Sequence, residues 1–308
     1  MDGLRTGNTF VASGQLIDRL AFAACVGNRG PHGHNEVAAK ALAIIAVLQN
    51  EDVDLKGCAT MGEKLVVPLG SDIVVAIVVR DPSGTNYSPY TFDNPSLAQV
   101  GISQPLDAPV LDHIDVIRGL VTGYRAPGTP GYAGEWPRTW IQPYLSDAKP
   151  SLDSVPAAAK NTSAALVRSF NSAAWKSVPG KPEYKVMSFR VRDVDASQYL
   201  RLRGTNLPPS VPFETDADGN PLPDVFTNPA AINPSSQGGA DGIPANNYLR
   251  IPCKVVGQSE FDDCPTHLPV VGETKYVAYD VAAWADLWFY SNPIYIQVNG
   301  SFTVAGVQ

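Results

Sequence analysis

Charged side chains are scarce in this chain. They make up 17% of its 308 residues, against about 25% in an average soluble domain. Proline and glycine are common instead, with 27 and 26 residues. Low charge together with frequent turn-forming residues favours a loop-rich β protein over a helical bundle.

Basic stretches and long apolar runs are also missing. The formal net charge is −7 and no basic stretch occurs, so the sequence has no electrostatic signature of nucleic-acid binding. The longest apolar run, at residues 38–48, is shorter than the roughly 18 residues that a membrane helix needs. The glycine and serine motifs of P-loops, dinucleotide-binding folds and hydrolase elbows do not occur either. We therefore expect no nucleic-acid partner and no membrane span.

Cysteine is rare, with four residues and no C-x-x-C pair, which argues against zinc ribbons and thioredoxin-type redox motifs. Cys253 and Cys264 flank a polar loop that a disulfide could close, or they are two separate buried thiols. Cys25 and Cys58 form the second candidate pair. Both disulfides together would indicate an oxidising compartment, so we expect an extracellular or periplasmic protein.

One segment has a clear helical pattern, and the rest is typical of strands. Residues 35–48 combine a capping Asn35, an acidic Glu36 in the first turn and an Ala/Leu/Ile face. From residue 63 onward, strand patterns recur at irregular intervals without βα alternation. We predict a mainly-β fold: an antiparallel, immunoglobulin-like β-sandwich at 63–308, preceded by a junction segment at 1–62 that holds the helix.

The first residues already have a pattern of their own. Asp2 to Arg5 is typical of a last helical turn, with Gly7 in the position of its C-cap, and residues 8–12 are typical of a short strand. Long Pro/Gly/Ser-rich connections at 87–109 and 123–156 are expected to be ordered loops.

Three stretches resemble a known family. "GLRTGNTFVASGQLI" at 3–17 is similar to a segment that many proteins of the PHP (polymerase and histidinol phosphatase) superfamily carry just after their metal-binding barrel. "YLRLRGTN" at 199–206 and "ADLWFYSNPIYIQV" at 285–298 resemble the closing strands of the same proteins. The intervening strands look like the β-sandwich between the family's opening segment and its closing strands.

The resemblance implies a function without catalysis in this chain. The family's metal ligands precede the first of these segments, so we expect the chain to be the C-terminal accessory module of a longer, secreted metal-dependent hydrolase, a phosphoesterase. Its partner would be the barrel, and the chain itself would hold no cofactor. The alternative is a module that binds carbohydrate or protein through Trp136, Trp140 and Tyr144.

Two groups of residues have the pattern of metal sites. Asp216, Asp218 and Asn220 have the 1, 3, 5 spacing of calcium loops, but position six is Pro221 rather than glycine. The alternative is a polar turn at Asp218. His32 and His34 would give, with one glutamate, at most three ligands, and a solvated loop is the favoured interpretation.

Two further groups have the chemistry of a site. Asp112, His113 and Asp115 permit acid–base or metal chemistry, although the favoured interpretation is the exposed side of a half-buried strand. The second group is a set of strand arginines that could bind an anionic ligand, with cross-strand pairing to Asp193 and Asp195 favoured instead. These arginines are Arg190, Arg192, Arg201 and Arg203.

Overall fold

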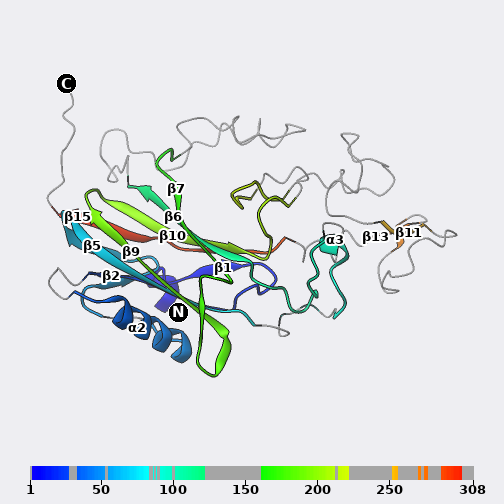
Figure 1. Ribbon diagram of the computed structural model, residues 1–308, viewed down its shortest axis with the longest axis horizontal. Coiled ribbons are helices and arrows are strands. Elements are labelled where there is room, and N and C mark those ends of the chain that lie inside the picture. The colour runs from blue at the N-terminus through cyan, green and yellow to red at the C-terminus, as the bar shows by residue number, and fades with distance from the viewer. Residues whose placement is uncertain are drawn as a thin grey trace.

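Two β-sheets stacked face to face form the body of the protein in a computed structural model, and a helix covers the outer face of one sheet (Figure 1). The structure describes residues 2–27, 33–52, 55–82, 86, 88, 91–98, 101–121, 161–211, 214–221, 252–255, 270–271, 274–276 and 286–299. This confirms the predicted mainly-β sandwich.

The five-stranded sheet lies between the helix and the other sheet. Its strand order is β3-β2-β5-β9-β8, with every neighbouring pair antiparallel. The central β5 is buried over seven successive residues because both of its faces are covered. The strands are β2 (Arg19–Val26), β3 (Cys58–Thr60), β5 (Ser71–Arg80), β8 (Lys176–Val178) and β9 (Lys181–Val194).

The helix that covers this sheet is α2 (Glu36–Gln49). The Asn35 side chain caps it by accepting a hydrogen bond from the Ala38 N–H at 2.8 Å, and Asn50 ends it in the left-handed conformation. The helix predicted at 35–48 is thus confirmed. Its buried face consists of small side chains, which let the helix approach the sheet closely: Ala39, Ala43, Ala46 and Val47.

The seven-stranded sheet has the order β1-β14-β10-β15-β4, and β6 pairs with both β10 and β7. Strands β14 and β15 follow one another along the same side of β10, interrupted at Pro293, which has no N–H to donate. The pairing of β15 with β4 is parallel. The strands are β1 (Phe10–Ala12), β4 (Lys64–Pro68), β6 (His113–Leu120), β7 (Ala165–Asn171), β10 (Gln198–Thr205), β14 (Trp288–Ser291) and β15 (Ile294–Asn299).

The remaining elements are short. Helix α1 (Asp2–Thr6) ends at Gly7, whose φ is 82° and whose N–H donates to the Gly3 carbonyl at 2.9 Å, as its sequence predicts. Helix α3 (Pro95–Ala98) lies in a connection. A small separate sheet has the order β11-β13-β12. Its strands are β11 (Pro252–Val255), β12 (Val270–Val271) and β13 (Thr274–Tyr276).

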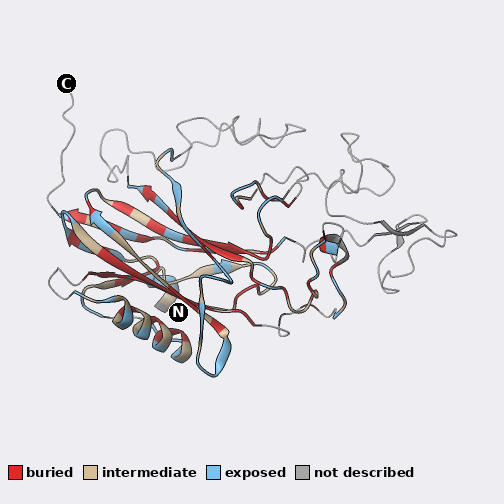
Figure 2. Ribbon diagram, in the orientation of Figure 1, coloured by how far each residue is buried: buried red, intermediate tan, exposed pale blue. Residues whose placement is uncertain are grey.

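The main core fills the space between the two large sheets, where buried stripes face each other (Figure 2). Alternate residues of each strand point into it, and burial of each large apolar side chain contributes about 1.5–3 kcal/mol. The predicted division at residue 62 runs through this sandwich, because β1, β2 and β3 all precede it. The fully buried side chains of the main core include Phe22, Ile73, Ile77, Ile114, Leu200, Leu202, Phe289 and Ile294. None of the described helices is long and apolar enough to cross a membrane.

Candidate functional site

Three stretches with candidate chemistry meet on the outer face of the seven-stranded sheet. Ile114 and Val116 of β6 point into the core, so His113 and Asp115 lie on the opposite face. In the β6–β10 register, Asp115 lies directly opposite Arg203. The turn at 214–221 folds over the same place and completes what we call the charge cluster: Asp112, His113, Asp115, Arg203, Asp216 and Asn220.

A buried ion pair is the centre of the charge cluster. Arg203 donates from Nε and Nη2 to Asp115 Oδ2, at 3.0 and 2.9 Å. Asp115 is only 1% exposed and Arg203 only 7%. Arg203 Nη2 also donates to Asn220 Oδ1 at 2.5 Å, which connects the sheet to the turn. Hydrogen bonds between ionised groups are stronger than neutral ones, and burial away from solvent strengthens them further.

His113 lies beside the ion pair with one nitrogen bound and the other enclosed. Its Nδ1 is 2.6 Å from Asp112 Oδ1, and its Nε2 is 3.7 Å from Asp115 Oδ2. Nε2 is buried and has no hydrogen-bond partner among the described residues. Gly219, with φ 75°, covers the ring so closely that a Cβ there would lie 3.0 Å from Nε2. The nitrogen that could act as a base therefore faces protein rather than an open surface.

The turn over His113 is organised by Asp216. Its Oδ1 accepts the backbone N–H groups of Asp218 and Asn220, at 2.9 and 2.8 Å, and its Oδ2 accepts from Asn220 Nδ2 at 2.8 Å. Desolvation acts to raise the pKa of Asp216, but hydrogen bonds from Asn220 and Asp218 and the charge of Arg203 outweigh it and hold that pKa below its ordinary value. Both carboxylate oxygens thus face N–H donors. The calcium site at Asp216, Asp218 and Asn220 stays a prediction.

Two sequence interpretations are wrong for physical reasons. His113 and Asp115 are buried, not the exposed side of a strand, because the turn covers the end of β6. The strand arginines do not pair with Asp193 and Asp195 across neighbouring strands, because β9 and β10 belong to different sheets. Arg203 pairs instead with Asp115, 88 residues away in sequence.

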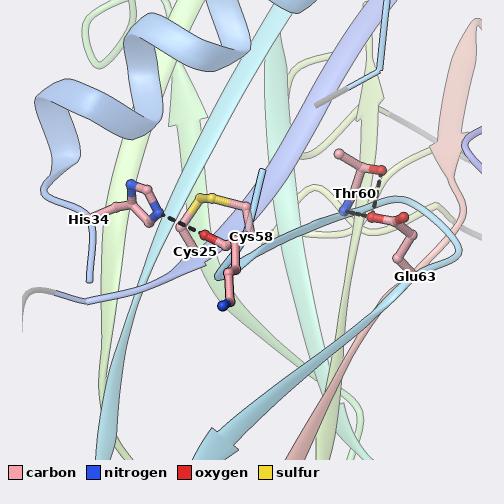
Figure 3. The surroundings of a disulfide bond; sticks show 6 residues. Cys25, His34, Cys58, Thr60 and Glu63 are labelled. Carbon is pink, nitrogen blue, oxygen red and sulfur yellow. Dashed lines mark hydrogen bonds between the residues drawn. A yellow bond between two sulfur atoms is a disulfide. The ribbon is translucent and has the colours of Figure 1, made fainter. Parts of the chain in front are cut away.

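The disulfide between Cys25 and Cys58 is present, as predicted (Figure 3). The two residues are register partners on β2 and β3, with Cα atoms 4.0 Å apart. Nearby, His34 Nε2 lies 3.2 Å from the Lys56 carbonyl oxygen, and Glu63 Oε2 accepts from the backbone N–H and the hydroxyl of Thr60. His34 thus contacts the chain just before β3, and Glu63 holds the last residue of β3.

Several predicted sites lie outside the residues that the structure describes. Cys253 belongs to β11, but its side chain lies outside the described residues. Five further residues with a predicted role also lie outside the described residues: Cys264, His32, Trp136, Trp140 and Tyr144.

Asp81, directly after β5, is a buried acid that the sequence pattern did not indicate. It is 6% exposed, and no residue in the described part of the chain forms a hydrogen bond with its Oδ1. Desolvation raises its pKa from 3.8 to about 6, although Lys185 and the Leu111 N–H act in the opposite direction. Many strands are followed by an aspartate at the start of a loop, so the sequence gives no sign that Asp81 is unusual. Only its burial in the structure shows this.

Asp81→Asn is expected to stabilise the protein at neutral pH. The raised pKa means that the native state binds more protons than the unfolded state between about pH 4 and 6, so stability from this group falls as pH rises through that window. At pH values above this window, burial of the ionised carboxylate lowers the free energy of unfolding by about 3 kcal/mol. This energy corresponds to the difference between a pKa of about 6 in the folded protein and the ordinary value of 3.8. Urea unfolding at pH 7.5 should show a gain of up to about 3 kcal/mol, and none at pH 3.5.

The exposed Asp195 gives the control for this variant. Asp195→Asn should change stability by less than about 0.5 kcal/mol at either pH. An Asp81→Asn gain that is equal at pH 3.5 and 7.5 would mean that ionisation is not its cause.

The charge cluster and the disulfide thus lie on different sheets and have different roles. The cluster joins β6, β10 and the turn at 214–221, and the disulfide joins β2 to β3. No protein-family model matches this chain, and comparisons with curated proteins and with solved structures found no match either.

Proposed function

We propose that the chain is a non-catalytic accessory module of a PHP-type metal-dependent hydrolase, a phosphoesterase that acts outside the cytoplasm. The observation that carries this proposal is that the three segments resembling the family lie side by side. Strand β1, from the first segment, pairs with β14, from the last, in the register Val11↔Tyr290. Strand β10, the third such segment, is the next neighbour of β14.

Hydrogen bonds of Asn292 also join the first of these segments to the last. Asn292 Nδ2 donates to the Gly7 carbonyl oxygen and to Thr9 Oγ1, both at 2.9 Å. The Asn292 N–H donates to the Thr9 carbonyl oxygen at 3.1 Å. Motifs nearly 285 residues apart in sequence form one hydrogen-bonded corner. Chance similarities in separate places would have no reason to meet, so their convergence supports a shared ancestry with the family's sandwich region.

The positions of the histidines support the non-catalytic part of the proposal. Hydrolysis by metal-activated water requires converging His and carboxylate ligands. His34 contacts a backbone carbonyl beside the disulfide, whereas His113 is enclosed by Asp112 and Gly219 on the other sheet. The Cys25–Cys58 disulfide supports an oxidising compartment.

A second candidate function is a module that binds carbohydrate or protein. One observation favours it: Trp288 and Tyr290 of β14 stack on the outer face of the seven-stranded sheet, with ring centroids 6.2 Å apart. Tyr290 is 38% exposed, and its cross-strand neighbour Val11 is 73% exposed. Half-exposed aromatic rings of this kind provide stacking surfaces for ligands.

The accessory-module proposal predicts that the chain alone has no hydrolase activity and that the barrel is needed for it. The purified chain should hold no stoichiometric zinc, manganese or iron and should not cleave p-nitrophenyl phosphate when these metals are added. The gene upstream of the Met1 codon should encode a barrel with a His-x-His motif in the same frame. The barrel and the module together should then hydrolyse the phosphoester.

Two outcomes would contradict the proposal. One is metal analysis that finds two or more transition-metal ions per chain, with activity that is lost in His34→Ala or His113→Ala. The other is an upstream sequence without any barrel. In that case, binding of oligosaccharides that is lost in Trp288→Ala and Tyr290→Ala would identify the second candidate function.

A further inference from the structure

A groove with four arginines opens at the edge of the sandwich, away from the charge cluster. Its volume is about 510 Å³, within the range of small-molecule sites. Val167 and Phe189 contribute apolar surface to its lining, and both also pack against the main core. The arginines, which define what we call the arginine groove, are Arg118, Arg168, Arg190 and Arg192.

Each sheet supplies two of these arginines because the groove lies between two free strand edges. Strand β7 pairs only with β6 among the described strands, so it forms one edge of the seven-stranded sheet. Strand β8 pairs with residues 181–186 of β9, so among the described strands the second half of β9 forms an edge of the five-stranded sheet. Arg118 and Arg168 come from the first sheet, and Arg190 and Arg192 from the second.

Only one of the four arginines is neutralised by the described part of the chain. Arg190 Nη1 lies 3.4 Å from Asp72 Oδ2, and its Nε lies 4.0 Å from Glu36 Oε1. Arg118, Arg168 and Arg192 have no ion-pair partner among the described residues, and all three are exposed. Such a concentration of positive charge is unexpected in a chain with a net charge of −7, in which 30 acidic residues outnumber 23 lysines and arginines.

Several of the groove's groups are held in position before any ligand arrives. The Arg168 guanidinium lies over the Phe170 ring, 5.6 Å from its centroid. Arg190 is fixed by Asp72, and Ser188 Oγ donates to Glu36 Oε2 at 3.1 Å. A preordered guanidinium loses less conformational entropy when it binds, and its planar fork matches the oxygens of phosphate.

We propose that the arginine groove binds a small organic phosphate. The doubly charged phosphate group would lie between the guanidinium groups of the two sheets, with its organic part against Phe189 and Val167. A phosphate monoester carries about −1.5 to −2 charges at pH 7, which matches the excess of four arginines over Glu36 and Asp72. This proposal does not depend on the accessory-module function, since it rests only on the residues of the groove.

Isothermal titration of the full chain with phenyl phosphate, at pH 7.5 and low salt, tests this site. Phenyl phosphate is expected to bind saturably, and Arg118→Ala and Arg168→Ala should each weaken its binding about tenfold. Arg201→Ala is the matched control, since Arg201 is an exposed strand arginine on the outer face of the seven-stranded sheet. It should leave the affinity unchanged.

Two further ligands test separately what the double charge and the aromatic ring contribute to binding. Phenyl sulfate, with a single charge, should bind more weakly than phenyl phosphate, and inorganic phosphate should also bind more weakly because it lacks the ring. Equal affinity for either ligand would contradict the corresponding part of the proposal. Melting temperatures of the unliganded variants show that each is folded.

Three results would overturn the site as a whole. These are the absence of saturable phenyl phosphate binding, equal binding by the wild type and the groove variants, and an equal loss in Arg201→Ala. Faster aggregation of Arg118→Ala and Arg168→Ala without any ligand binding would assign the arginines to protection of the strand edges instead.

Discussion

Replacement of Arg203 by methionine is expected to lower the free energy of unfolding by about 3–5 kcal/mol. The methionine fills much of the same volume but leaves Asp115, 1% exposed, without its cation. It also removes the hydrogen bond from Arg203 to Asn220 and so releases the turn that covers His113. Urea unfolding at pH 7.5, followed by tryptophan fluorescence and circular dichroism, measures the loss.

A second substitution tests whether the uncompensated charge is the cause. Asp115→Asn in the Arg203→Met background should recover part of the stability, because a neutral amide costs less to bury than a carboxylate. Arg201→Met, on the same strand but exposed, should cost less than about 0.5 kcal/mol. A loss below about 1 kcal/mol in Arg203→Met, or a double variant no more stable than the single one, would contradict a central role for this ion pair.

Removal of the Cys25–Cys58 disulfide is expected to lower stability by about 3–4 kcal/mol. The bond closes a loop with a sequence separation of 33 residues, and the chain-entropy estimate for a loop of that size is in this range. It also ties the short strand β3 to β2, whose ladder has three residue pairs, one of them Cys25 and Cys58 themselves. The Cys25→Ala, Cys58→Ala double variant should therefore unfold at a lower urea concentration than the oxidised wild type.

Reduction provides the control for this variant. Dithiothreitol should destabilise the wild type by a similar amount, since it removes the same cross-link without changing the packing of Cys25 against α2 and β5. A wild type that is insensitive to dithiothreitol would contradict the prediction. A further effect of dithiothreitol on the double variant would instead report the disulfide predicted between Cys253 and Cys264.

Features that depend on neighbouring residues were determined by the sequence itself. Helix α2 has its N-cap at Asn35 and its small-residue face within 15 positions, and α1 ends at Gly7, where glycine readily adopts a positive φ. The two-sheet class follows from strand patterns without βα alternation. Each of these signals is local, because capping, helical periodicity and turn geometry act within a few residues.

The sites depended on tertiary structure, because strand pairing joins residues that no local pattern connects. The partner of Arg203 is 88 residues away, and its identity follows only from the register of β6 against β10. Four cysteines permit three pairings, and only the β2–β3 register places Cys25 opposite Cys58. In the same way, Arg190 and Arg192 could be noticed as neighbours in sequence, whereas the stacking of the sheets brings Arg118 and Arg168 to the same groove.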